Sequence, residues 1–309
     1  MLRSLSSGIS GMKNNQIKMD VIANNVANVG TTAFKSGRTR FQDIFSQTLR
    51  GASAPEPNGR GGVNPSQIGL GMQTAGKDTM MGQGAPQPTE RALDFMVSGE
   101  TFFVLSDGSK QVYTRDGSMS FDASVPDKTD ANIKRRNIVS STGLKLMGYQ
   151  IESVDNDGKV KYKNPAALEE ITIPDSYKGK DESGNDVYIK LNNFSVDKDG
   201  TVVGVFEDGT KQEFGKIATA AFSNPAGLLK VGNNNYLPSA NSGDALTLKD
   251  PNTESTGNND ILQGYLEMSN VDLANEFTDM IVTSRSFQAN SRSITTSDEM
   301  LQELLNLKR

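Results

Sequence analysis

The chain has 309 residues, 35% of them hydrophobic and 6% aromatic, and its formal net charge at pH 7 is -5. A chain of this length holds two or three domains, and the low apolar content argues against one large core. The mixed charge disfavours a nucleic-acid-binding surface, and no apolar run approaches the ~18–20 residues of a transmembrane helix. Without cysteine, disulfides and thiolate zinc sites are excluded. We expect an extended, modular protein with no nucleic-acid partner and no membrane insertion.

The first 29 residues have the periodicity of an α-helix. Apolar positions recur at steps of three and four, which keeps them on one side of a helix. One row is apolar throughout and the other is interrupted by polar or small residues: Leu5, Met12, Met19 and Val26 against Leu2, Ile9, Gln16 and Ala23. Gly30 is a suitable stop signal. Gly8 and Gly11 each cost roughly 1 kcal/mol relative to alanine, so this helix needs partners to form.

Residues 31–90 are interpreted as a glycine- and proline-rich connecting arm. Within them, the apolar residues of segment 39–49 predict a short helix. From Gly51 to Gly84, glycine and proline recur too often for a regular helix, which indicates a loop, an extended arm or a linker. In a polymer subunit such an arm has a use, because it can lie along neighbouring subunits. A disordered linker is the alternative.

Short β strands separated by tight turns are predicted between about residues 91 and 268. Alternating and β-branched segments are followed by aspartate–glycine pairs, which favour hairpins. These pairs begin at Asp107, Asp116, Asp157, Asp199 and Asp208. The expected strands are 94–97, 101–105, 111–114, 118–121, 138–149, 159–162, 171–173, 187–191, 201–206, 212–214, 217–222 and 235–237.

The segment from Ser269 to Arg309 is predicted to be a second, longer helix of about 55–60 Å at ~1.5 Å per residue. Ser269 and Asp272 form a weak capping signal at its start. One row of its seam is apolar throughout: Leu273, Met280, Phe287, Ile294 and Leu301. The other row is partly small and polar: Phe277, Ser284, Ser291, Asp298 and Leu305. A mixed seam suits close packing against another helix. Two interpretations stay open, an intramolecular two-helix stalk and an assembly element completed by neighbouring subunits.

The predicted fold class is multi-domain α + β. Long N- and C-terminal helices, residues 1–30 and 269–309, form one coiled-coil-like domain, and mainly β domains are nested between them. Residues 91–145 and 216–268 form a β domain, and residues 146–215 form an outer β insertion domain.

No constellation of residues points to catalysis or to a cofactor. The chain has no histidine, which removes the commonest acid–base group and metal ligand at neutral pH. Segments 155–158 and 197–200 superficially resemble calcium loops, but their glycine is the fourth residue rather than the sixth. We interpret them as hairpin turns. The expectation is a protein that is not an enzyme, with no catalytic, cofactor-binding or metal site.

Both ends of the chain carry motifs that resemble one protein family, the bacterial flagellar rod and hook proteins. The N-terminal match begins with MLRSLSSGISGM, and the final segment DEMLQELLNLKR resembles the hook members most closely. The matching segments are 1–12, 23–29 (ANNVANV), 32–35 (TAFK), 264–273 (GYLEMSNVDL), 277–281 (FTDMI), 285–290 (RSFQAN) and 298–309. Two long motifs in the right order at opposite ends make this resemblance specific. The resemblance implies a concentric plan, in which the helices of residues 1–30 and 269–309 form an inner assembly domain and residues 146–215 lie outermost.

The resemblance implies a structural subunit of the flagellar hook, a tubular and flexible homopolymer that transmits motor torque from rod to filament. It implies partners among the rod and hook–filament junction proteins, the hook cap and the type III export apparatus. The chain would lie outside the cell in the hook and basal body, after export without a cleaved signal peptide. A distal rod subunit is the nearest alternative, and a non-flagellar coiled-coil surface protein is a further one.

The residues expected at the assembly interface are the apolar members of the two helical seams. They are Leu5, Ile9, Met12, Met19, Val26, Leu273, Phe277, Met280, Phe287, Ile294, Leu301 and Leu305.

Overall fold

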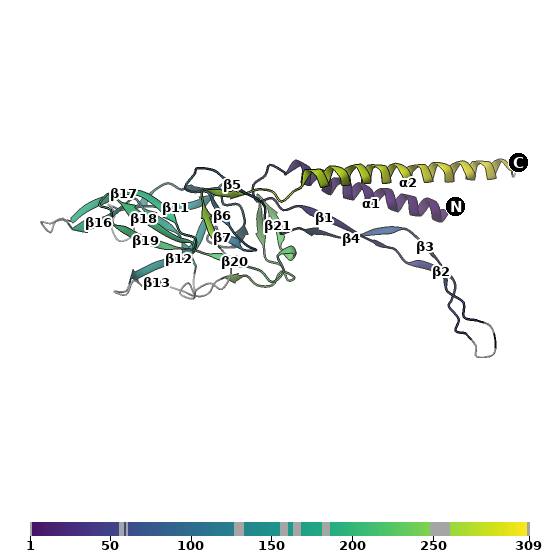
Figure 1. Cartoon of the computed structure of the whole chain (residues 1–309), viewed down its shortest axis with the longest axis horizontal. Coiled ribbons are helices and arrows are strands. Elements are labelled where there is room, and N and C mark those ends of the chain that lie inside the picture. Colours follow the sequence, from purple (N-terminus) through teal and green to yellow (C-terminus); the bar gives the residue numbers. More distant parts are fainter. Residues whose placement is uncertain are drawn as a thin grey trace. The chain divides into compact units, whose positions relative to one another are not determined.

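The computed structural model describes residues 2–55, 59, 61–126, 133–154, 160–162, 168–180, 186–247 and 260–307. As predicted, it is mostly β, with a long helix near each end of the chain (Figure 1). The coiled-coil character of the helices stays a prediction. Contacts divide the chain into unit 1, residues 1–29, 35–80 and 271–309, and unit 2, residues 30–34 and 81–270. The chain therefore crosses between the units after residues 29, 34, 80 and 270.

Unit 1 is built on two antiparallel helices, α1 (Leu2–Ala27) and α2 (Leu273–Leu307), which lie side by side in Figure 1. Gly8 faces Ile294 and Lys18 Nζ is 3.3 Å from Asp279 Oδ1, so residues near the start of one helix meet residues near the end of the other. With 35 residues at ~1.5 Å each, α2 is about 52 Å long.

The start of α2 differs from the predicted one. The helix begins at Leu273 rather than at Ser269, because Asp272 is the residue that caps it. The Asp272 carboxylate accepts hydrogen bonds from the backbone N–H groups of Ala274 at 2.9 Å and Asn275 at 3.4 Å. These are donors that the first turn of a helix leaves without intrahelical partners.

Two β ribbons complete unit 1. Strand β1 (Gly37–Asp43) pairs with β4 (Met72–Thr79), and β2 (Ser46–Arg50) pairs with β3 (Ser66–Gly69), all antiparallel. The predicted short helix over 39–49 is therefore wrong. Pairing with a strand that returns from later in the chain satisfies the backbone of this segment, and such tertiary pairing overrides a weak local helical pattern. The ribbons belong with the helices, whereas the sequence pattern set residues 31–90 apart.

Unit 2 consists of short antiparallel strands. They are β5 (Pro86–Pro88), β6 (Phe95–Val97), β7 (Phe102–Ser106), β8 (Gln111–Thr114), β9 (Met119–Phe121), β10 (Val125–Pro126), β11 (Lys134–Ser140), β12 (Lys145–Val154), β13 (Val160–Tyr162), β14 (Glu169–Glu170), β15 (Thr172–Pro174), β16 (Ser176–Lys180), β17 (Asp186–Val196), β18 (Thr201–Phe206), β19 (Lys211–Ile217), β20 (Thr219–Ala221), β21 (Leu229–Gly232), β22 (Asn235–Leu237), β23 (Leu246–Thr247), β24 (Ile261–Gln263) and β25 (Tyr265–Glu267). A short 3-10 helix, η1 (Pro225–Gly227), precedes β21.

Most of the predicted strands and turns are confirmed. Segment 138–149 is not a single strand, because a turn in which Gly143 N donates to Ser140 O separates β11 from β12. Asp116 and Gly117 do not close a hairpin, because β8 pairs with β7 and β22 whereas β9 pairs with β11. Asp107 and Gly108 connect the paired strands β7 and β8, and Asp208 and Gly209 connect β18 and β19. Asp157 and the first calcium-like loop, 155–158, lie outside the described residues. The second such loop, 197–200, is the turn between β17 and β18, in which Gly200 N donates to Asp197 O at 2.8 Å.

Two apolar clusters form the core of unit 2. The first is centred on Phe95, Phe103 and Leu146, and the second packs Phe102 against Phe222 and Tyr236 with edge-on ring contacts at 5.7 Å. Strands from the two ends of the unit pair with each other, β5 with β25 and β6 with β24. The β domain is therefore closed by residues that lie just before α2.

Candidate assembly surface and buried polar junction

The helical pair presents apolar side chains that the single chain leaves uncovered. Of the residues expected at the assembly interface, Phe287 is 41% exposed, Leu305 is 67% exposed, and Ile9, Leu273 and Phe277 are also exposed. The remaining ones are partly buried: Leu5, Met12, Met19, Val26, Met280, Ile294 and Leu301. Contact between α1 and α2 does not bury these rows completely, so their outer sides are available to other molecules.

The face of α1 that is turned inward is not the one that the sequence pattern predicted. Its most buried residues follow the same three-and-four spacing, but they are the glycines, asparagines and a single isoleucine: Gly8, Gly11, Asn14, Asn15, Ile22 and Asn25. The predicted apolar rows lie beside this face. Gly8 and Gly11 were expected only to weaken the helix, and the common spacing of the glycines and asparagines was the signal available for this face.

The inward face of α2 shows the same offset. Its apolar row from Met280 to Leu301 is partly buried, as expected for a row near the partner helix. The second predicted row of the seam, with Ser284, Ser291 and Asp298, is not the buried one. The two buried residues of the helix are instead Thr283 and Ser297. Small side chains at the contact allow the helices to approach closely.

Buried asparagines tie the β1–β4 ribbon to the helices. Asn25 Nδ2 donates to Gly37 O and to Glu276 Oε1, both at 2.9 Å, and Gly37 N donates back to Asn25 Oδ1 at 2.9 Å. Asn14 Nδ2 donates to Met72 O at 2.7 Å, and its Oδ1 accepts from Thr74 Oγ1 at 2.8 Å. Side-chain amides on α1 therefore replace the missing sheet neighbours of the ribbon edges.

The β2–β3 ribbon carries a second exposed apolar set. Phe45, between β1 and β2, is 89% exposed, and Leu49 and Ile68 on the ribbon are exposed as well. Both strands are exposed along their full lengths. Such a ribbon is too thin to bury its own side chains, since a two-stranded hairpin has no second layer.

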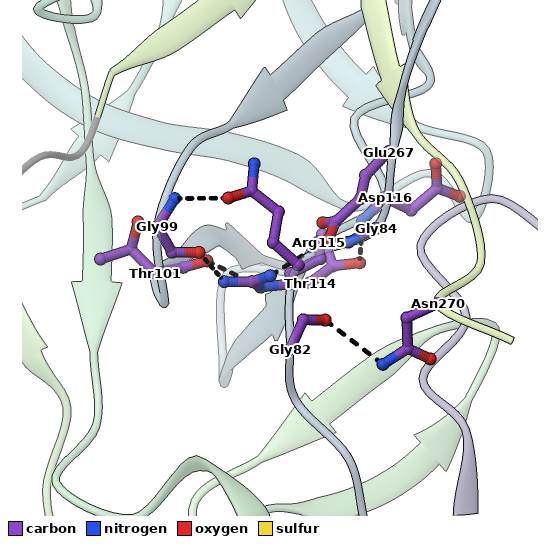
Figure 2. Close-up of polar contacts among 10 residues, drawn as sticks. Gly82, Gly84, Gly99, Thr101, Thr114, Arg115, Asp116, Glu267 and Asn270 are labelled. Carbon is purple, nitrogen blue, oxygen red and sulfur yellow. Dashed lines mark hydrogen bonds and ion pairs between the residues drawn. The ribbon is translucent and has the colours of Figure 1, made fainter. Parts of the chain in front are cut away.

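A buried ion pair lies in unit 2 near the point where the chain leaves for α2 (Figure 2). Arg115 Nη1 is 3.2 Å from Glu267 Oε1, and both side chains are 1% exposed. Arg115 also donates to the carbonyl oxygens of Thr101, at 3.1 Å, and Gly99, and its guanidinium lies 5.2 Å from the centre of the Phe102 ring. The guanidinium is therefore held by a carboxylate, two carbonyls and an aromatic face.

Glu267 connects this ion pair to two other segments of unit 2. Its Oε1 accepts a hydrogen bond from Gly84 N at 2.8 Å, and its backbone oxygen accepts one from Ala33 N at 2.7 Å. Gly84 has no room for a side chain, because a Cβ atom there would lie 1.9 Å from Met268 O. Nearby, Asn270 N donates to Phe34 O at 3.4 Å, and Asn270 Nδ2 donates to Gly82 O at 3.3 Å (Figure 2).

The electrostatic effects around this junction come mainly from burial. Burial raises the pKa of the Tyr236 hydroxyl to about 12, while the charge of Arg115 lowers it and that of Glu267 raises it. Burial also lowers the pKa of Lys230, whose Nζ lies 5.2 Å from the centre of the Phe34 ring.

The described part of the chain offers no group of histidine, cysteine, aspartate and glutamate side chains that could hold a metal ion. Over the same residues, neither helix is long and apolar enough to cross a membrane. What the geometry provides is a helical pair and a ribbon with uncovered apolar surface, and a β unit whose entry and exit segments are joined by a buried polar junction.

Comparison with known proteins gives a consistent picture along the chain. Three protein-family models match the chain. Residues 5–35 match the flagella basal body rod protein family, and residues 96–204 match the D1 domain of the flagellar hook protein FlgE/F/G family. Residues 262–307 match the C-terminal region of the flagellar basal body rod FlgEFG protein family. The chain is 41% identical over 311 residues to the flagellar basal-body rod protein FlgG of Bacillus subtilis, with both chains fully covered. It is 34% identical to FlgG and 32% identical to the flagellar hook protein FlgE of Borreliella burgdorferi, again with both chains fully covered.

Proposed function

Because the chain belongs to the family of flagellar rod and hook proteins, we propose that it is a hook subunit, which polymerises with copies of itself into a flexible tube. Its relatives are structural proteins of the flagellar rod and hook, so the chain is a structural component of the flagellum. Its partners in this role are other copies of the chain, the rod and hook–filament junction proteins, the hook cap and the type III export apparatus.

The observation that carries the polymer is the uncovered apolar surface of unit 1. Phe277, Phe287 and Leu305 of α2 remain exposed although α2 lies along α1. Burying a large apolar side chain is worth about 1.5–3 kcal/mol, and a helical array repeats each such contact at every subunit. The helical pairs of neighbouring copies can cover these side chains, since both helices carry rows of apolar residues that are only partly buried.

The choice of hook over rod rests on the β region and on the C-terminal ending. We propose that residues 91–145 and 216–268 form the β domain and that residues 146–215 form the outer insertion. Both boundaries fall within strands, β12 and β19, which pair with Gly148 opposite Ile217. A segment that leaves and returns on adjacent strands can be carried as an outer domain, and a flexible joint has more use for such a domain than a stiff shaft.

A rod subunit is the second candidate. It is favoured by the 41% identity to a protein named as a rod protein and by the equal coverage of the two chains. A rod and a hook differ in stiffness rather than in subunit chemistry, so the mechanical properties of the polymer distinguish them.

The test is polymerisation of the purified chain, followed by electron microscopy. Curved tubes with a variable radius are expected for a hook subunit. Straight tubes without measurable curvature would contradict the hook proposal and favour the rod proposal. A chain that stays monomeric at millimolar concentration, and that also fails to extend isolated hook or rod fragments, would overturn both.

A further inference from the structure

The polar junction occupies a particular place in the chain path. Ala33, Gly84 and Glu267 each lie within four residues of a point where the chain passes between unit 1 and unit 2. All three are joined at one residue, since Glu267 accepts a hydrogen bond from Ala33 through its backbone and from Gly84 through its side chain. Arg115, far from these segments in sequence, holds the same carboxylate.

We propose that the Arg115–Glu267 pair is a mechanical clamp, which holds together the entry and exit segments of unit 2 when tension reaches it through the chain. Tension on the N-terminal side arrives at residues 30–34, and tension on the C-terminal side arrives at residue 270. The bonds from Ala33 N to Glu267 O and from Asn270 N to Phe34 O connect these segments. With the bonds of Thr32 to Asn234 and Asp116, they are among the contacts in unit 2 that such tension stretches.

The clamp explains why a charge is buried here. A buried ion pair is a poor way to gain equilibrium stability, since well-packed apolar residues often do as well. Charged hydrogen bonds are strong and directional, however, so they resist separation over a short distance. Arg115 is anchored to Gly99 and Thr101 on the neighbouring backbone, which ties the exit segment to β7 (Phe102–Ser106), a strand of the core.

The packing around the pair leaves it little freedom. Gly84 lies against Met268 O so closely that no side chain fits, and Met268 N donates to Ala85 O at 3.0 Å. β5 and β25 pair from Pro86 opposite Glu267 to Pro88 opposite Tyr265. The backbone of Glu267 cannot move away from Arg115 without breaking this short ribbon, so a displacement of the exit segment loads the ion pair and the ribbon together.

The experiment pulls single full-length molecules by cysteines appended to the two ends of the chain. The chain itself contains no cysteine, so attachment is unique. Glu267→Gln keeps an oxygen for Gly84 N and Arg115 but removes the charge. We expect this variant to unfold unit 2 about tenfold faster at constant force, because forced unfolding follows the unfolding rate and a charged hydrogen bond is lost from the native state.

A double variant separates a mechanical role from a stabilising one. Arg115→Met with Glu267→Met removes both buried charges, so its thermal unfolding midpoint is expected to equal or exceed that of Glu267→Gln. Its unfolding under force is expected to stay fast. The control is the partly exposed pair Lys145 and Glu170, with Nζ 2.8 Å from Oε2, whose double variant Lys145→Met, Glu170→Gln should unfold at the wild-type rate under force.

Two results would overturn the clamp. One is an unfolding rate under force in Glu267→Gln that equals that of the wild type. The other is a double variant that regains both thermal stability and resistance to force, which would make the pair an ordinary stabilising contact. The measurement concerns the isolated subunit, so a failure to form tubes would count against the proposed function and leave the clamp untouched.

Discussion

Gly11 of α1 lies against Asn290 of α2 so closely that a Cβ atom built on Gly11 would be 2.6 Å from Asn290 Nδ2. One turn earlier, a Cβ atom on Gly8 would be 3.1 Å from Ile294 Cγ1. The two helices therefore meet backbone to side chain at this point. A glycine that weakens an isolated helix strengthens this pair by permitting a close approach.

Gly11→Leu is expected to separate the N-terminal half of α1 from α2. The larger side chain does not fit against Asn290, and overpacking of this kind costs about 1–3 kcal/mol. Thermal unfolding followed by circular dichroism at 222 nm should show an earlier loss of helix. Lys13→Leu is the control, because Lys13 is exposed on the same helix and should change the transition little. Equal transitions in the two variants would contradict the close contact.

Asn25→Ala is expected to release the β1–β4 ribbon from the helices. The substitution removes the hydrogen bonds to Gly37 N, Gly37 O and Glu276 Oε1, and leaving such groups without partners costs about 1–3 kcal/mol. Hydrogen exchange should be faster for the amides of β1 (Gly37–Asp43). Asn24→Ala is the matched control, since the Asn24 side chain is exposed and the hydrogen bonds to the ribbon are made by Asn25. Unchanged exchange in Asn25→Ala would remove the anchor.

Phe287→Asp is expected to abolish polymerisation while unit 2 stays folded. Phe287 is partly exposed in the single chain, so a charge there is tolerated by the monomer but would have to be buried in an assembly contact. Thr296→Asp is the control. Thr296 is exposed and lies nine residues, or about two and a half helical turns, after Phe287, so its side chain is on the opposite side of α2. Electron microscopy should show tubes from the control and none from Phe287→Asp. Normal tubes from both would remove Phe287 from the interface.

Asp107 should make the β7–β8 turn sensitive to strong acid. Hydrogen bonds from the backbone N–H groups of Ser109 and Lys110, and from the Ser109 hydroxyl, hold the pKa of Asp107 at about 2 against an ordinary value of 3.8. Because the folded pKa is the lower one, the contribution is complete above 3.8 and is lost as the pH falls through about 2. The thermal midpoints of wild type and Asp107→Asn should differ by a constant amount near neutral pH and converge near pH 2.

An NMR titration of the Asp107 carboxyl carbon checks the same point directly. A midpoint close to 3.8 would show that the turn does not stabilise the carboxylate. The comparison is made with an unstructured peptide that contains the same turn sequence.

Features that depend on neighbours along the chain can be predicted from the amino-acid sequence. The rows through Met12 and Met280 repeat every three or four residues, and this local periodicity predicts helices whatever lies beside them. Aspartate–glycine pairs such as Asp107 and Gly108 likewise predict hairpin turns, since a tight turn is a matter of a few backbone angles. The motifs at the two ends were sufficient to recognise the family.

The choice of the helix faces that meet depends on contacts between distant parts of the chain. Gly11, Asn25 and Ser297 are buried in the helical unit, although hydrophobicity alone would predict that the apolar rows turn inward. The apolar rows can stay partly exposed in one chain because another chain can cover them. The strand pairing of β1 with β4 and the contact of Arg115 with Glu267, 152 residues apart, join distant segments. Such contacts depend on where the folded chain returns, and no local pattern contains that information.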